Sequence, residues 1–231
     1  MTKKINRLLI IPARANSKRI KNKNIKIFCG HPIIYYSLQT ARKSKLFTKI
    51  HVSTDSEKII KILKKYNFIV DFKRPKKISS KYIQVIDVLR YVVDEYKKKG
   101  FEFDEIWSLS ACSPLTKVKD LLSAAKLMSE KKNKILLPVT EYSAPIEWAF
   151  KFKKNNHLKP IRSGFYKKRS QDLEKKYHDT GAFICIPKKF LSKKIKLLDQ
   201  HYLGKIIPKS RSIDIDEIED WKLAESLYKK R

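Results

Sequence analysis

Several features that would assign a simple function class are missing from this sequence. No apolar run approaches the ~20 residues that a membrane-spanning helix needs. The stretch Leu8 to Pro12 is too short for the apolar region of a signal peptide. The three cysteines are widely spaced and form no C-x-x-C pair, which predicts neither a disulfide framework nor a zinc site. We therefore expect a cytoplasmic protein with no membrane partner.

Acidic residues are also scarce, with 23 Asp and Glu against 54 Lys and Arg, so the formal net charge is +31. Such an excess is typical of proteins that bind nucleic acid. The lysines, however, are spread over almost every segment, and no stripe alternates basic and aromatic residues as a single-strand groove does. We interpret most of them as a solvated surface and expect no specific nucleic-acid partner. A basic nucleic-acid-binding module remains the alternative from a different function class.

The remaining composition is that of a globular chain, because 42% of the 231 residues are hydrophobic and 11% are aromatic. Strand-like and helix-like patterns alternate through the first 140 residues. The strand patterns cover 8–13, 49–54, 68–72, 105–110 and 134–140, and the helix patterns cover 32–45, 56–66, 82–99 and 117–131. This alternation predicts an α/β fold with a mostly parallel, Rossmann-like sheet.

The alternation stops between Glu141 and Tyr177. Two short aromatic stretches there, 148–152 and 161–166, predict a β-hairpin or loop excursion from the sheet, suited to a partner or a substrate lid. The pattern then resumes with predicted strands at 182–186, 205–208 and 212–215 and a final helix at 217–228. With no repeat or linker, we expect one domain over residues 1–231.

A basic loop follows the first predicted strand. Ligands of open α/β sheets bind beyond the carboxyl ends of the strands, where this loop lies. It delivers Arg14, Ser17, Lys18, Arg19, Lys21, Lys23 and Asn24. Clustered cations repel one another unless an anion lies among them, which favours a polyphosphate site. The loop has neither the Walker A nor the G-x-G-x-x-G spacing, and a solvated basic loop is the alternative interpretation.

Two aspartates near the carboxyl terminus complement this loop. On a strand, Asp214 and Asp216 would share one face while Ile213 and Ile215 enter the core. Paired carboxylates suit Mg²⁺, which is usually held by one or two carboxylates and substrate phosphates. The alternative is a polar edge strand that leads into the last helix. The basic loop and the two aspartates together indicate metal-assisted nucleotidyl transfer.

A third cluster comprises residues 169–173 and 177–181, Arg-Ser-Gln-Asp-Leu and Tyr-His-Asp-Thr-Gly. It is rich in hydrogen-bonding groups of fixed geometry and could recognise the carboxylate and hydroxyls of a sugar acid. His178 alone is equally well explained as a hydrogen-bonded structural histidine.

The run from Ile10 to Arg14, with Ser17 to Ile20 and Lys23-Asn24, resembles the signature loop of the CMP-sugar-acid synthetases, the acylneuraminate cytidylyltransferases. The third cluster, Pro145-Ile146 and Ser53-Thr54-Asp55 are most similar to the pseudaminic acid cytidylyltransferase branch. The resemblance extends from Leu8 to about Leu227.

This resemblance implies a nucleotide-diphospho-sugar-transferase-like fold, in which the 141–177 excursion reaches across a homodimer. It implies that Arg14, Ser17, Lys18, Lys23 and Asn24 bind the nucleotide, with Arg74, Ser110 and Cys112 beside it. The sugar acid would face Arg169, Gln171, His178 and Asp179. Asp214 and Asp216 would bind the Mg²⁺ cofactor.

The reaction implied is attack by the anomeric C2 hydroxyl of a nonulosonic acid on the α-phosphorus of CTP, with release of pyrophosphate. The catalytic residues would be Arg14, Lys23, Asp214 and Asp216. Pseudaminic acid, activated for surface glycans, is the favoured acceptor. Sialic, legionaminic and 3-deoxy-octulosonic acids remain alternatives.

Overall fold

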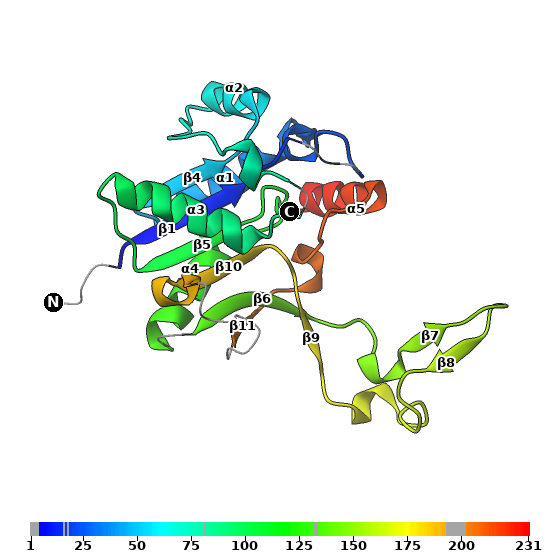
Figure 1. The fold of residues 1–231 in the computed structure, drawn as a ribbon. Helices are drawn as coiled ribbons and strands as arrows, with labels where there is room; N and C mark the ends of the chain where they lie inside the picture. The colour runs from blue at the N-terminus through cyan, green and yellow to red at the C-terminus, as the bar shows by residue number, and fades with distance from the viewer. Residues whose placement is uncertain (1–4, 16, 18, 81, 132–133, 193–201) are drawn as a thin grey trace.

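A central sheet organises the chain in the computed structural model, which describes residues 5–15, 17, 19–80, 82–131, 134–192 and 202–231 (Figure 1). Its strand order is β11-β6-β10-β5-β1-β4, with β9 paired to β6. The strands are β1 (Arg7–Pro12), β4 (Lys49–Ser53), β5 (Glu105–Leu109), β6 (Ile135–Glu141), β9 (Tyr177–Asp179), β10 (Phe183–Pro187) and β11 (Tyr202–Ile206). The β1 strand pairs in parallel with β4 and β5, as β6 does with β11, whereas β10 runs antiparallel between β5 and β6. The predicted α/β fold with a mostly parallel sheet is confirmed.

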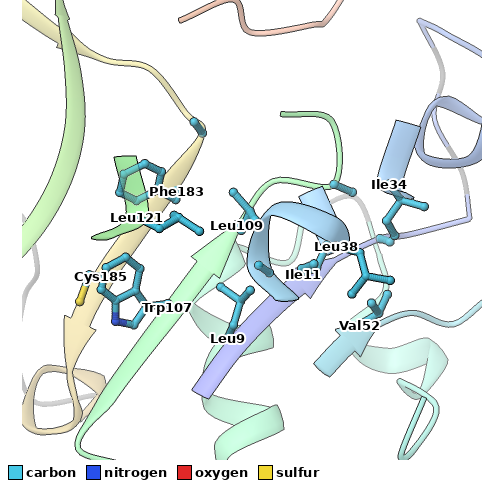
Figure 2. Packing of buried hydrophobic residues seen from close by; sticks show 14 of the residues in the cluster. Leu9, Ile11, Ile34, Leu38, Val52, Trp107, Leu109, Leu121, Phe183 and Cys185 are labelled. Atoms are coloured by element: carbon cyan, nitrogen blue, oxygen red, sulfur yellow. The ribbon is translucent and has the colours of Figure 1, made fainter. Parts of the chain in front are cut away.

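Helices cover both faces of this sheet. They are α1 (Ile33–Ser44), α2 (Glu57–Lys65), α3 (Val85–Lys98), α4 (Val118–Glu130) and α5 (Ile218–Lys229). In β1, Leu9 and Ile11 pack in one core with residues of α1 and α4 (Figure 2) and also of α2, while Leu8 and Ile10 pack in a second core with residues of α3. Burial on both faces explains why the first strand is a continuous apolar run rather than an alternating one.

Shorter elements complete the chain. They are the strands β2 (Ile27–Phe28), β3 (His31–Pro32), β7 (Phe150–Phe152) and β8 (Leu158–Pro160), and the 3-10 helices η1 (Lys23–Ile25), η2 (Lys76–Ile78), η3 (Ile146–Trp148), η4 (Ser170–Asp172), η5 (Lys188–Leu191) and η7 (Lys209–Arg211). The β7–β8 hairpin confirms the predicted excursion, and it projects away from the central sheet on an arm (Figure 1). We call residues 142–176 the arm. Among the described residues, no helix is long and apolar enough to cross a membrane.

Two predicted strands are not formed. Residues 68–72 make no strand pairing; instead Phe68 and Val70 pack on one core and Phe72 on the other. This placement past the edge of the sheet buries alternate side chains and so imitates the pattern of a strand. Residues 212–216 also lack regular structure, and the last strand lies earlier than predicted, at Tyr202–Ile206.

Candidate active site

A third core cluster joins the two ends of the chain. Ile20 from the basic loop, Phe28 and Cys112 pack there with Ile215 and with Trp221 of α5. Ile215 is fully buried, and the aspartates flank it. Anchoring of Ile215, rather than a strand, therefore fixes the position of Asp214 and Asp216.

Lys23 connects the basic loop to this carboxyl-terminal segment. Its Nζ donates to the carbonyl oxygen of Ile215 at 2.6 Å and lies 3.1 Å from Asp216 Oδ1. Arg19 Nη2 lies 2.8 Å from the other oxygen of Asp216. Desolvation opposes the charge of Asp216, but Lys23 and Arg19 hold the pKa of this carboxyl below its ordinary value. The predicted meeting of amino-terminal cations with the two carboxyl-terminal aspartates is thus observed for Asp216.

Asp214 has a different environment. It lies beside Gly181, where an added Cβ would be 3.5 Å from Asp214 Oδ2, and Gly181 has a φ of +66° that favours glycine. Desolvation raises the pKa of Asp214, and the charge of Asp216 raises it further. Among the described residues, no Lys or Arg forms an ion pair with Asp214. Its negative charge is therefore available to a bound cation.

Hydrogen bonds from residues that directly follow β5 fix the basic loop. Cys112 Sγ donates to Asn24 Oδ1 at 3.3 Å, and Asn24 Nδ2 donates to the carbonyl oxygen of Arg14 at 3.0 Å. Burial raises the pKa of Cys112 to about 12, so its thiol remains neutral and able to donate. Ser110 Oγ accepts a hydrogen bond from the Cys112 backbone at 3.2 Å. This chain of contacts restrains Arg14 and Asn24 at the site.

Arg74 also lines the site and is 4% exposed. Its backbone N–H donates to the carbonyl oxygen of Thr54 at 2.8 Å, and its guanidinium lies 3.9 Å from Asp55 Oδ1. Among the described residues, its Nε has no hydrogen-bond partner. A buried unsatisfied donor of this kind suits an acceptor on a ligand.

Most of these side chains line one cavity of about 610 Å³, whereas Asp214 and Asp55 are not on its wall. The predicted site residues on its wall are Arg14, Ser17, Lys23, Asn24, Arg74, Ser110, Cys112 and Asp216. A second cavity of about 350 Å³ shares Pro12, Val85 and Ser110 with it and reaches Asp179 and Gly181. Lys18 lies outside the described residues. We call the larger cavity the cleft; its excess of cations makes it a site for a polyanion.

Among the described residues, the predicted sugar-acid residues do not line one common cavity. Asp179 borders the second cavity, and desolvation raises its pKa. His178 Nδ1 is hydrogen-bonded at 2.9 Å to the carbonyl oxygen of Asp179. Arg169 and Gln171 lie on the arm, where Arg169 pairs with Asp172 at 2.9 Å and Gln171 borders a separate hollow. Neither Arg169 nor Gln171 lies on the wall of the cleft or of the second cavity.

Sequence reasoning missed three contributors to the site. Arg19 was recognised as a loop cation but not as a partner of Asp216, and Gly181 was not linked to Asp214. Asp55 belongs to the Ser53-Thr54-Asp55 run at the end of β4, and this position at the carboxyl edge of the sheet was the signal that could have identified it.

The fold and the cleft place this chain among nucleotide-binding transferases with an α/β sheet. The fold matches a solved CMP:2-keto-3-deoxy-manno-octonic acid synthetase in complex with CTP, with a TM-score of 0.72, 14% identity, and coverage of 97% of this chain and 99% of that one. The model of the cytidylyltransferase family matches residues 8–203. The chain therefore belongs to the cytidylyltransferase family and is a nucleotidyltransferase.

Relatives within this family are similar over nearly the whole chain. A pseudaminic acid cytidylyltransferase of Campylobacter jejuni is 35% identical over 222 residues, which cover 96% of each chain. An N-acylneuraminate cytidylyltransferase of Escherichia coli is 25% identical over 239 residues, covering 97% of this chain and 52% of the relative. The resemblance noted from the sequence is confirmed.

Proposed function

We propose that this protein transfers CMP from CTP to the anomeric C2 hydroxyl of a nonulosonic acid, with pseudaminic acid favoured, and releases pyrophosphate. The observation that carries the proposal is the meeting of Lys23 and Arg19 with Asp216 at the wall of the cleft, with distances of 3.1 and 2.8 Å. The similarity to the pseudaminic acid enzyme of Campylobacter jejuni supports the choice of acceptor.

The cleft suits the needs of phosphoryl transfer. In such reactions the enzyme mainly positions the reactants and neutralises charge, because the attacking and leaving oxygens belong to the substrates. Arg14 and Lys23 line the cleft and are our candidates for holding the phosphates, and Ser17 and Asn24 add hydrogen-bonding groups. Stabilising charge on the β- and γ-phosphates favours departure of pyrophosphate.

Asp214 and Asp216 fit a magnesium ion that is shared with the substrate. Among the described residues, no group of three or more His, Cys, Asp or Glu could hold a metal alone. Two carboxylates therefore need phosphate oxygens to complete the coordination, as is usual for Mg²⁺ in nucleotide sites. When bound, the ion would neutralise phosphate charge as a Lewis acid. Asp214 is the better available ligand, since Asp216 is also paired with Lys23 and Arg19.

The second cavity is our candidate for the sugar acid. It adjoins the cleft through Ser110 and is bordered by Asp179, whose carboxylate can accept hydrogen bonds from sugar hydroxyls. An acceptor bound there would lie next to a nucleotide in the cleft, as direct transfer requires.

We further infer that the arm acts across a homodimer. It exposes large apolar side chains, namely Phe150, Phe152, Leu158, Ile161 and Tyr166, of which Phe152 is 68% exposed. Contiguous apolar surface of this kind is typical of protein interfaces. Arg169 and Gln171 lie on this arm and line neither cavity of their own chain, so we infer that they would meet the sugar acid at the second cavity of a partner.

We expect the enzyme to work in the cytoplasm. The structure leaves Cys29, Cys112 and Cys185 as free thiols, and Cys112 and Cys185 are buried. Unpaired thiols suit a reducing compartment.

A coupled pyrophosphate assay tests the proposed function. Purified protein with CTP and Mg²⁺ should release pyrophosphate with pseudaminic acid faster than with sialic, legionaminic or 3-deoxy-octulosonic acid. Preference for another of these acids would correct the acceptor alone. Activity only with an aldose 1-phosphate would refute the reaction. Salt-sensitive binding of short duplexes without CTP turnover would favour the nucleic-acid alternative.

A further inference from the structure

The end of β4 holds two separate parts of the cleft wall. Ser53 accepts a backbone hydrogen bond from Ala13 at 2.9 Å, at the start of the basic loop. The next carbonyl, that of Thr54, accepts from the backbone N–H of Arg74 at 2.8 Å. This short segment therefore connects the start of the basic loop with Arg74 on the cleft wall.

The side chain of Asp55 makes the same connection through a single atom. Its Oδ1 accepts a hydrogen bond from the backbone N–H of Ala15 at 3.1 Å and lies 3.9 Å from Arg74 Nη2. The Asp55 side chain is 20% exposed and that of Arg74 is 4% exposed. Both contacts are thus shielded from solvent, where charge interactions are least screened.

The charges explain why a carboxylate is needed here. Burial lowers the pKa of Arg74, the Asp55 carboxylate raises it, and the nearby cation Arg14 lowers it. Two arginines therefore share one cavity and repel each other before a nucleotide is bound. Among the described residues, Asp55 is the carboxylate paired with Arg74, so it offsets this repulsion.

We propose that Asp55 is a positioning residue that holds the basic loop and the Arg74 guanidinium at a fixed separation, so that both meet one nucleotide. Asp55 is not on the cavity wall and acts through Ala15 and Arg74 rather than by touching the substrate. This inference rests on the proposed function, because it assumes that CTP occupies the cleft.

The central test is the steady-state kinetics of Asp55→Ala and Asp55→Asn. Loss of a buried contact to a charged group is expected to raise the KM for CTP about 10- to 100-fold in Asp55→Ala. The kcat at saturating CTP and the KM for the sugar acid should change much less, because the lost interaction concerns nucleotide binding. Asp55→Asn keeps an oxygen acceptor for Ala15 but lacks the charge, so its KM should fall between those of the wild type and Asp55→Ala.

Asp71→Asn provides a matched control. Asp71 is 24% exposed, bonds Lys49 and Tyr96 at 2.7 Å each, and lies near the other end of β4. Its substitution should lower the melting temperature and leave the KM for CTP unchanged. If Asp71→Asn raised this KM as much as Asp55→Asn, the effect would be a general loss of stability and the positioning role would be refuted.

A double variant tests whether Asp55 acts through Arg74. In an Arg74→Ala background, Asp55→Asn should raise the KM for CTP by less than it does in the wild type, since the charge it removes has lost its partner. Fully additive effects would contradict the inference, as would a normal KM for CTP in a folded Asp55→Ala enzyme. Absence of turnover in the wild type with every nonulosonic acid is a different outcome, which would refute the proposed function and this inference with it.

Discussion

The cleft and the arm differ in how far apart in the sequence their paired charges lie. In the cleft, Lys23 pairs with Asp216, 193 residues further along the chain. On the arm, Arg169 pairs with Asp172, three residues away. The cleft therefore depends on the complete fold and is assembled within one chain. The arm is held partly by contacts within itself, such as the 3.2 Å hydrogen bond from Trp148 Nε1 to the carbonyl oxygen of Phe165, and presents apolar side chains to the outside.

This difference indicates which half of the reaction each region serves. A cleft whose cations are fixed by distant partners is preorganised for a ligand of fixed charge, such as a triphosphate. The arm carries groups suited to a sugar acid, but in the described part of the chain Gln171 borders a hollow that shares no lining residue with the cleft. We infer that nucleotide binding needs one chain and that acceptor binding needs two.

The largest expected effect comes from Asp216→Ala. Turnover should fall at least about 1,000-fold, because the change removes a proposed metal ligand and leaves Lys23 and Arg19 without their partner. The melting temperature should change little, because this carboxylate is partly exposed. Glu95→Ala, which breaks an ion pair with Lys98 on α3, should retain normal turnover in the same pyrophosphate assay. Near-normal turnover of Asp216→Ala would remove this residue from the metal role.

Arg14→Ala should have the next largest effect. The KM for CTP is expected to rise about 10- to 100-fold through loss of a charged contact to phosphate, while the KM for the sugar acid stays within about twofold. Initial-rate kinetics with each substrate varied in turn measure the two values. Equal changes in the KM for CTP and the KM for the sugar acid would contradict separate sites for the nucleotide and the acceptor.

Changes on the arm should affect assembly before nucleotide binding. Phe152→Asp places a charge on the proposed interface and should weaken the dimer at least about tenfold, as seen by sedimentation velocity over a concentration series. CTP affinity, measured by calorimetry, should remain normal because the cleft is complete in one chain. A wild-type monomer, or an unchanged dimer in this variant, would contradict the role given to the arm.

The smallest effect on activity is expected from His51→Phe. His51 is buried on β4 and stacks on Phe72. Burial lowers the pKa of His51 to about 4, whereas the unfolded chain has a value near 6.5. The unfolded state therefore binds the proton first, and stability is lost as the pH falls from about 6.5 towards about 4. Between pH 7 and pH 5, the wild type should lose about 2 kcal/mol more unfolding free energy than His51→Phe. Urea unfolding at the two pH values measures this, and equal losses would refute it.

The α/β fold and its mostly parallel sheet could be predicted from the sequence, because strands that are covered on both faces are continuous apolar runs. Residues 68–72 misled the same reasoning, since side chains packed past a sheet edge bury alternate positions without pairing. The strand predicted at 212–215 was wrong, and this segment is held instead by burial of Ile215 and by the hydrogen bond from Lys23 to the Ile215 carbonyl oxygen.

The site was predictable where residue type carries the chemistry, as in the basic loop and the two aspartates. The role inferred for Asp55 depends on contacts with Ala15 and Arg74, which are distant in sequence and visible only after folding. The functions given to Arg169 and Gln171 rest on the family resemblance. No local sequence pattern indicates whether Arg169 and Gln171 face a site of their own chain or of a partner.

The central claim is that the basic loop and the two aspartates bind one CTP together with one divalent ion. Electron paramagnetic resonance of Mn²⁺, used in place of Mg²⁺, measures this directly. The wild type should bind about one Mn²⁺ tightly when CTP is present and only weakly without it, and Asp214→Ala/Asp216→Ala should lose this CTP-dependent binding. Equal Mn²⁺ binding by the wild type and the double variant in the presence of CTP would contradict the account.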